Sequence, residues 1–212
     1  MTARSDVTAI VLAGGRASRF GSQKLAAEIG GVTVLDRAIR SVDTVAGQII
    51  LAGVEPAGAA GLRSETEASF RTLPDATPFA GPLVALGGAL ATTSTRYALV
   101  AGGDMPGLVP AVLALMLDLL GTNDTADAVI LGAPKAADRR QVLPLALRAS
   151  PARLAIEASI AAGESSLQAF LDRLTWLADP AEAWLELDPA GLTVLDIDRP
   201  IDLERARKHN FR

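Results

Sequence analysis

The sequence predicts an α/β fold with a mostly parallel sheet and helices on both of its faces. Two observations carry this prediction. Short aliphatic runs fit strands that are buried on both faces, as in a parallel sheet. These runs are VTAIVL (7–12), QIILAG (48–53), RYALVAG (96–102) and DAVILG (127–132). Helix-like segments separate them, and such alternation is typical of a parallel sheet covered on both sides.

The expected helices in this first part of the chain are VLDRAIRSV (34–42), PLVALGGALAT (82–92) and VPAVLALMLDLL (109–120). Pro82 and Pro110 favour the first turn of a helix, where the missing N–H group costs nothing.

After about residue 140 the pattern is looser. We expect a strand at 142–148, helices at 151–163, 164–174 and 199–208, and short strands at AWLEL (183–187) and LTVLDI (192–197). We find no internal repeat and no linker long enough to separate domains. The prediction is one domain over residues 1–212.

Composition excludes several classes of function. The chain has 212 residues, no cysteine and a formal net charge of −4. The charge argues against general nucleic-acid binding, and the missing cysteines exclude thiolate catalysis and the usual structural zinc sites. The single histidine, His209, is expected in a solvated tail and not in a catalytic triad. Without an apolar stretch of about 20 residues or a targeting segment, we expect a cytoplasmic protein with no membrane partner.

Ligands of a parallel sheet bind beyond the carboxyl ends of its strands, and we expect three stretches there, two after predicted strands and one in a third loop. They are LAGGRASRFGSQK (12–24), LPDATPFAGPL (73–83) and AGGDMPG (101–107).

The first stretch is interpreted as a cradle for a nucleoside triphosphate. Gly14 and Gly15 let the backbone approach phosphate oxygens, and Arg19 and Lys24 supply positive charge. It is neither a P-loop, because Gly15 and Gly21 stand one residue too far apart, nor GxGxxG. The alternative is a glycine-rich surface turn with solvated basic residues.

A divalent cation such as Mg²⁺ is expected beside the third stretch. Asp104 follows a buried strand and is a candidate metal ligand, although a turn or helix-cap role is the alternative. Asp196 and Asp198 are two apart on a predicted strand, so their side chains share one face. We choose Asp198, nearer the strand end, as the second ligand; it could instead be the N-cap of the closing helix.

These stretches resemble the molybdenum cofactor guanylyltransferases. LAGGRASRFGSQK is similar to the LAGGxSxRMGxxK signature of nucleotidyltransferases, and GGDMP to the metal-binding motif of the family. AGPLVALGGAL, RRQVLPLALR and DIDRPIDL resemble three further segments in the family's order, so the resemblance runs from Ile10 to Leu203.

The resemblance implies a single-domain, three-layer α/β/α Rossmann-like nucleotidyltransferase fold and a Mg²⁺-dependent reaction. The phosphate of a molybdopterin acceptor would attack the α-phosphate of GTP, and pyrophosphate would leave. Residues 1–106 would form the nucleotide-binding half, and residues 107–212 the acceptor-binding half.

The resemblance also implies site residues. Arg19, Lys24 and Asp104 would be catalytic, and Asp104 and Asp198 would hold the metal. The nucleotide-binding set would be Leu12, Ala13, Gly14, Gly15, Lys24, Asp75, Gly81 and Asp104.

The sequence also departs from the family pattern. Ala52 stands where the family usually has Asn, Ala17 replaces the signature serine, and Gln23 replaces an acidic residue. Ser165 and Ser166 stand where guanylyltransferases often place basic residues near the acceptor.

Three alternatives therefore stay open. The first is a cytidylyltransferase of the same cofactor, because the closing DIDRPIDL suggests those relatives. The glycine pair LAGG favours GTP, since it leaves room for a purine. The second is a sugar-phosphate nucleotidyltransferase, and the third is a non-catalytic nucleotide- or partner-binding protein.

Overall fold

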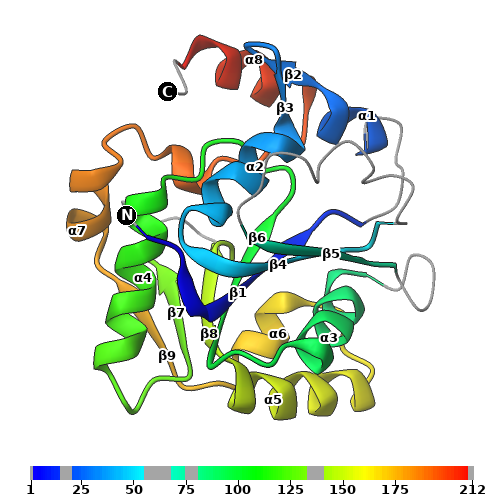
Figure 1. Cartoon of the computed structure of the whole chain (residues 1–212), viewed down its shortest axis with the longest axis vertical. Helices are drawn as coiled ribbons and strands as arrows, with labels where there is room; N and C mark the ends of the chain where they lie inside the picture. The colour runs from blue at the N-terminus through cyan, green and yellow to red at the C-terminus, as the bar shows by residue number, and fades with distance from the viewer. Residues whose placement is uncertain (1, 15–20, 55–67, 75–80, 133–140, 210–212) are drawn as a thin grey trace.

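The computed structural model describes residues 2–14, 21–54, 68–74, 81–132 and 141–209 (Figure 1). Within these residues, seven strands form one sheet in the order β5-β4-β1-β6-β8-β7-β9. Their bounds are β1 Arg4–Leu12, β4 Ala46–Ala52, β5 Ser69–Leu73, β6 Tyr97–Gly102, β7 Ala128–Leu131, β8 Leu145–Arg148 and β9 Trp176–Asp179. Neighbouring strands are parallel except where β8 pairs with β6 and β7. The predicted mostly parallel sheet is confirmed.

Helices cover both faces of this sheet, as expected (Figure 1). α2 (Val34–Asp43), α4 (Pro110–Thr122) and α7 (Ala181–Leu187) pack on one face. α3 (Pro82–Thr92), α5 (Ala149–Ala161) and α6 (Leu167–Leu171) pack on the other. Pro82 and Pro110 occupy the first turns of α3 and α4, as predicted.

The core explains why the strand sequences do not alternate. Every residue of β6 is buried, because successive side chains enter opposite faces of a sheet that is covered twice. Leu99 belongs to the core under α2 and α4, whereas Val100 belongs to the core under α3 and α5.

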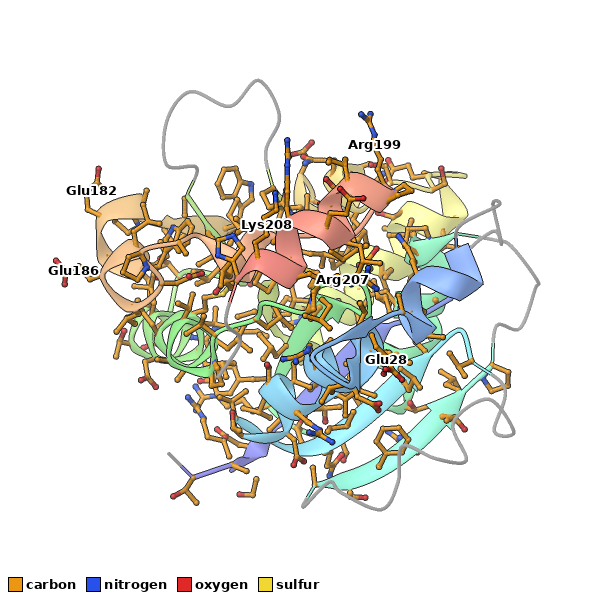
Figure 2. The ribbon with its side chains drawn as sticks, turned by 90° about the horizontal axis from the view of Figure 1, so that it is seen from above. Glu28, Glu182, Glu186, Arg199, Arg207 and Lys208 are labelled. Atoms are coloured by element: carbon orange, nitrogen blue, oxygen red, sulfur yellow. The ribbon has the colours of Figure 1, made fainter. Side chains whose placement is uncertain are left out.

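A smaller cluster ties the beginning of the chain to its end. α1 (Gly21–Ala26) is followed by the hairpin β2 (Glu28–Ile29) and β3 (Val32–Thr33), and the closing helix α8 (Pro200–Lys208) packs against it. The buried members of the cluster are Ile29, Val34, Ile197, Leu203 and Ala206. Arg207 on α8 donates through Nε and Nη2 to the Glu28 carbonyl oxygen, each at 3.2 Å (Figure 2). The segment after Lys24 is therefore held beside the segment after Asp198.

Two strand predictions in the last third of the chain are wrong. AWLEL (183–187) lies in helix α7, and LTVLDI (192–197) begins with a 3-10 turn, η2 (Leu192–Val194), and continues without a strand partner. Buried Thr193 fixes the turn, because its N–H donates to Asp188 Oδ2 at 2.6 Å and its hydroxyl accepts from Val109 N at 3.2 Å. These side-chain contacts outweigh the strand propensity of the segment.

Among the described residues, the sequence did not predict five elements: α1, β2, β3, β5 and β9. β5 and β9 form the two edges of the sheet. Across the part of the chain that the structure describes, no helix is both long enough and apolar enough to span a membrane.

The carboxyl group of Asp179, at the end of β9, allows a test of stability against pH. Asp179 is 2% exposed, and its Oδ2 atom has no hydrogen-bond partner among the described residues. Burial raises the pKa of this carboxyl above its ordinary 3.8. A carboxyl whose folded pKa is raised favours folding below its unfolded pKa, and this contribution is lost as the pH rises through the folded pKa.

We therefore expect Asp179→Asn to increase the free energy of unfolding at pH 7 by about 1 kcal/mol, since it removes a buried, partly unpaired charge. The gain should disappear below about pH 4, where the wild-type carboxyl is also neutral. Urea unfolding at both pH values measures it, with the exposed Glu186→Gln on α7 as the control. An equal gain at both pH values would rule out an effect of charge.

Candidate active site

The carboxyl ends of β1, β4 and β6 meet at one edge of the sheet. Leu12 pairs in register with Ala52 on one side and with Gly102 on the other. Beyond these pairs, Ala13 N and Gly14 N both donate to the Ala52 carbonyl oxygen, at 2.9 and 3.2 Å. The backbone of Leu12, Ala13 and Gly14 therefore lies where a nucleotide was expected.

The Ala13 and Gly14 N–H groups are thus engaged with the sheet, so further donors for phosphate would have to come from later in the loop. Gly15 and Arg19, to which sequence assigned that role, lie outside the described residues, as does Asp75. Gly81 is described and is the N-cap of α3, with φ of +95°, a value that favours glycine. Ala52 is fully buried and offers the site only its carbonyl oxygen.

The turn after β6 presents Asp104 close to β1. Gly103 N donates to the Leu12 carbonyl oxygen at 2.9 Å. A Cβ atom on Gly103 would stand 3.0 Å from Leu35 Cδ1 and 3.2 Å from Ala13 Cβ. Glycine suits this position, because a larger residue would require Leu35 on α2 or Ala13 after β1 to shift.

Lys24, Asp104 and Asp198 come together at this edge, although they are far apart in sequence. Lys24 Nζ lies 2.7 Å from Asp104 Oδ2 and 3.2 Å from Asp198 Oδ1. Burial by itself would lower the pKa of the Lys24 ammonium, but the hydrogen bond and charge of Asp104, together with Asp198, outweigh burial and raise it. The structure thus joins three of the predicted catalytic and metal-binding residues into one cluster.

Of the alternative roles proposed for these two aspartates, the structure is consistent with the turn role of Asp104 and shows neither helix-cap role. Asp104 does lie in a turn, but its carboxylate pairs with Lys24, and the N-cap of α4 is Val109. The N-cap of α8 is Arg199, whose N–H donates to Asp202 Oδ2 at 2.8 Å, so Asp198 does not cap that helix.

Asp196 also belongs to this site, because it lines a pocket with Asp104 and its carboxyl feels the charge of Asp198. Ile197 between them is fully buried, and its N–H donates to the Asp104 carbonyl oxygen at 2.9 Å. Asp196 is exposed on its outer side, but its inner side lines a pocket. This partial burial raises the pKa of Asp196, and the negative charges of Asp198 and Asp104 add to the shift.

The carboxylate oxygens of Asp104 and Asp198 fit a divalent cation that is bound together with phosphates. The Lys24 ammonium is itself a cation and donates to both carboxylates. Its position shows that the carboxylates of Asp104 and Asp198 can converge on a single positive charge. Mg²⁺ is usually held by one or two carboxylates plus substrate phosphates. Among the described residues, no group of three acidic, histidine or cysteine side chains forms a cage of its own. Two carboxylates and a triphosphate are therefore the expected ligands.

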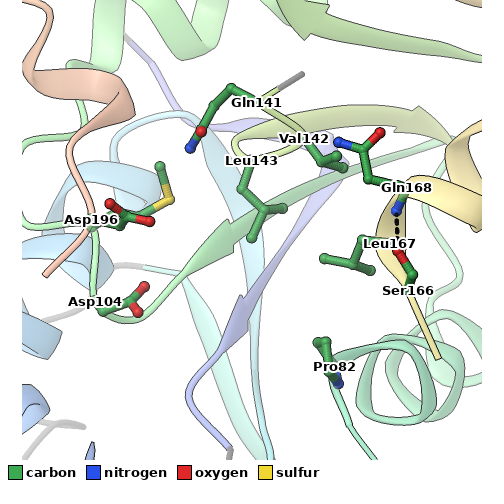
Figure 3. Close-up of a pocket in the computed structure, with 10 residues that line it drawn as sticks. Pro82, Asp104, Gln141, Val142, Leu143, Ser166, Leu167, Gln168 and Asp196 are labelled. Carbon is green, nitrogen blue, oxygen red and sulfur yellow. Dashed lines mark hydrogen bonds between the residues drawn. The ribbon is translucent and has the colours of Figure 1, made fainter. Parts of the chain in front are cut away.

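A pocket of about 520 Å³ opens beside Asp104 and Asp196. Figure 3 shows these two carboxylates on one side of it and the start of α6 on the other. Its further lining residues are Pro82, Met105, Gln141, Val142, Leu143, Ser166, Leu167 and Gln168. Ser166 accepts a hydrogen bond from Gln168 N at 3.1 Å and so caps α6. Sequence reasoning placed Ser166 near the acceptor but missed Gln141 and Gln168. Gln141 had a signal, since it lies in the segment RRQVLPLALR that resembles the family, whereas Gln168 is only a polar residue in the first turn of a helix.

Comparison with known proteins agrees with this geometry. The sequence profile of the MobA-like NTP transferase domain matches residues 9–178. The chain belongs to this family. The resemblance inferred from LAGGRASRFGSQK and the later motifs is thereby confirmed, as is its classification as a nucleotidyltransferase.

Two curated relatives match along nearly their whole length, and both are described as probable molybdenum cofactor guanylyltransferases. The protein from Chloroflexus aggregans is 28% identical, over 93% of this chain and 92% of its own. The protein from Pelotomaculum thermopropionicum is 27% identical, over 95% of this chain and 92% of its own.

Solved structures confirm the fold. Molybdopterin-guanine dinucleotide biosynthesis protein A from Archaeoglobus fulgidus superimposes with a TM-score of 0.73 at 24% identity, covering 95% of this chain and 97% of that one. A 4-diphosphocytidyl-2C-methyl-D-erythritol synthase from Anaerococcus prevotii gives 0.74 at 16% identity, covering 96% and 95%. These superpositions confirm the predicted Rossmann-like nucleotidyltransferase architecture.

Proposed function

We propose that this protein is a Mg²⁺-dependent guanylyltransferase that transfers GMP from GTP to the phosphate of molybdopterin and releases pyrophosphate. The observation that carries the proposal is the convergence of Lys24, Asp104 and Asp198 at the carboxyl edge of the sheet. This cluster offers both carboxylates for a metal ion and an ammonium for phosphates.

The two halves of the chain would divide the substrates. Residues 1–106 would bind the nucleotide along Leu12, Ala13, Gly14 and the loop that follows. Residues 107–212 would supply most of the acceptor pocket. Asp104 lines that pocket and also pairs with Lys24, so it stands at the junction between the two substrates.

The reaction requires little covalent participation from the protein. An acceptor phosphate oxygen forms a bond to the α-phosphorus of GTP, the bond to the bridging oxygen breaks, and pyrophosphate leaves. The acceptor phosphate is already an anion, so no general base is needed. Bound Mg²⁺ would neutralise charge on the nucleotide phosphates. Lys24 would stabilise the charge that develops on the departing pyrophosphate, and Arg19, from sequence, would share that role.

The pocket chemistry supports an acceptor with a neutral, hydrogen-bonding ring. Gln141 and Gln168 bring amide groups, while Leu143 and Leu167 bring apolar surface. Such a combination orients a flat heterocycle through its polar edge and its faces. The pterin ring of molybdopterin meets these requirements. Since GTP is a cytoplasmic substrate, the proposal also places the reaction in the cytoplasm.

Calorimetric titration with GTP, CTP, ATP and UTP in the presence of Mg²⁺ tests the nucleotide, and pyrophosphate release with molybdopterin tests the reaction. We expect selective binding of GTP in the micromolar-to-millimolar range, and release of pyrophosphate only when GTP and acceptor are both present. A preference for CTP would reassign the protein to the cytidylyltransferases of this fold. Nucleotide binding without pyrophosphate release would indicate either another acceptor, such as a sugar phosphate, or a non-catalytic protein.

A further inference from the structure

The ammonium group of Lys24 lies between the two carboxylates that a metal ion would need. Its Nζ atom contacts Asp104 Oδ2 at 2.7 Å and Asp198 Oδ1 at 3.2 Å. The side chains of Lys24 and Asp104 are only 20% and 25% exposed, so water screens this pair less than an ordinary surface ion pair.

We propose that Lys24 holds the cation position in the free protein and that it moves from the carboxylates to the triphosphate when nucleotide and metal ion bind. Lys24 would therefore act in two places in turn: first as an internal counter-ion, then as a phosphate ligand. This inference rests on the proposed function and adds to it that the nucleotide and the metal ion bind together, each strengthening the binding of the other.

Charge gives the first reason for the exchange. Asp104, Asp196 and Asp198 bring three carboxylates to this site. Within the described residues, Lys24 forms ion pairs with Asp104 and Asp198. If a divalent ion entered while Lys24 stayed, two cations would share the same carboxylate oxygens and repel each other strongly at such a distance. If Lys24 left without a new anion, its partly buried charge would lose its partners. Binding of metal ion alone is therefore unfavourable.

A triphosphate removes this conflict because it provides new anionic partners for Lys24. The carboxylates then become available to the divalent ion, which the same phosphates also help to hold. Metal ion and nucleotide should consequently strengthen each other's binding, and by linkage the two effects must be equal.

The local structure allows such a movement without refolding. Lysine carries its charge on a flexible four-carbon stem, so the ammonium can change partners by side-chain rotation. Its backbone lies in α1, which packs on α2 and leads into the hairpin held by α8. The backbone segments that carry the two aspartates are joined without Lys24, since the Asp104 carbonyl oxygen accepts from Ile197 N. The exchange therefore requires only the side chain of Lys24 to move.

The exchange can be tested by measuring the affinity of the full chain for Mn²⁺ in the absence of nucleotide. Electron paramagnetic resonance detects the bound Mn²⁺. We expect Lys24→Met to bind Mn²⁺ at least about ten-fold more tightly than wild type, because the competing charge is gone. Lys24→Arg keeps the charge and is the matched control; its Mn²⁺ affinity should stay within a few-fold of wild type. Circular dichroism verifies that each variant is folded.

Two further measurements test whether the gain in Mn²⁺ affinity arises from the freed carboxylates. Adding Asp198→Asn to Lys24→Met should abolish the gain in Mn²⁺ affinity, since it removes one of the freed carboxylates. GTP should increase the Mn²⁺ affinity of wild type about ten-fold or more, and this increase should be smaller in Lys24→Met. A Lys24→Met protein with wild-type or weaker Mn²⁺ affinity would overturn the inference, and so would a gain that survives Asp198→Asn.

The outcomes separate this inference from the proposed function. If the enzyme releases pyrophosphate from GTP but Mn²⁺ affinity does not respond to Lys24→Met, the function stands and the exchange is wrong. If no nucleotide binds but Lys24→Met tightens Mn²⁺ through Asp198, Lys24 is an internal counter-ion and the guanylyltransferase proposal fails.

Discussion

Replacing Asp104 with asparagine is expected to reduce kcat/KM for GTP-dependent pyrophosphate release by about a thousand-fold. A metal ion on developing phosphate charge contributes several kcal/mol, and each 1.4 kcal/mol or so is a factor of ten in rate. Asp104 also pairs with Lys24 and lines the pocket, so its carboxylate acts where both substrates would meet. Asparagine keeps the shape of the side chain and removes its charge.

The matched control is Asp118→Asn. Asp118 is also an aspartate in an ion pair, with Arg4 at 3.2 Å, but it lies on α4, and its 71% exposed side chain is not part of the candidate site. We expect near wild-type kcat/KM for this variant and little change in its free energy of unfolding, because exposed ion pairs contribute about 0–1 kcal/mol. If Asp104→Asn kept more than a tenth of the wild-type activity, Asp104 would not be the metal ligand.

Much of the fold could be predicted from sequence because the central strands carry an unmistakable pattern. The runs at 7–12, 48–53, 96–102 and 127–132 are buried on both faces, so nearly every position is apolar. The edge strands β5 and β9 escaped prediction for the opposite reason. β5 has no fully buried residue, and a half-exposed strand of this length carries little hydrophobic signal.

Sequence also placed Lys24, Asp104 and Asp198 in one site. Lys24 and Asp104 do follow strands of the sheet, where ligands bind, whereas Asp198 was assigned from a strand that the structure does not contain. Sequence could not show that Lys24 contacts the two aspartates directly. That contact depends on α8 packing against the hairpin β2–β3, a tertiary contact across the length of the chain. The pocket residues Gln141 and Gln168 were missed because a glutamine near an element boundary looks like any surface residue.

The misreading of AWLEL as a strand leads to the prediction with the largest expected effect on stability. As a strand, the segment would alternate between two faces, with Trp184 and Glu186 on the same side. As a helix, it places Ala181, Trp184, Leu185 and Asp188 on one side, and these four are its buried or half-buried residues. The spacing of three and four was therefore present in the sequence, but it spanned too few turns to stand out.

Trp184 packs α7 against the core of the molecule. Its side chain is fully buried in the core beneath α4, and its Nε1 atom donates to the Gly132 carbonyl oxygen at 3.0 Å. We expect Trp184→Ala to lower the free energy of unfolding by about 3–5 kcal/mol, since it leaves a large cavity and an unpaired carbonyl group.

Urea unfolding monitored by circular dichroism measures this loss, and Trp184→Phe separates its two causes. Phenylalanine fills most of the cavity but cannot donate the hydrogen bond, so its loss should be about 1–2 kcal/mol. Trp184 lies outside the candidate site, so the folded fraction of either variant should keep the nucleotide affinity of wild type. A loss below about 1 kcal/mol for Trp184→Ala would mean that α7 contributes little to the core. Equal losses in the two variants would assign the effect to the hydrogen bond and not to packing.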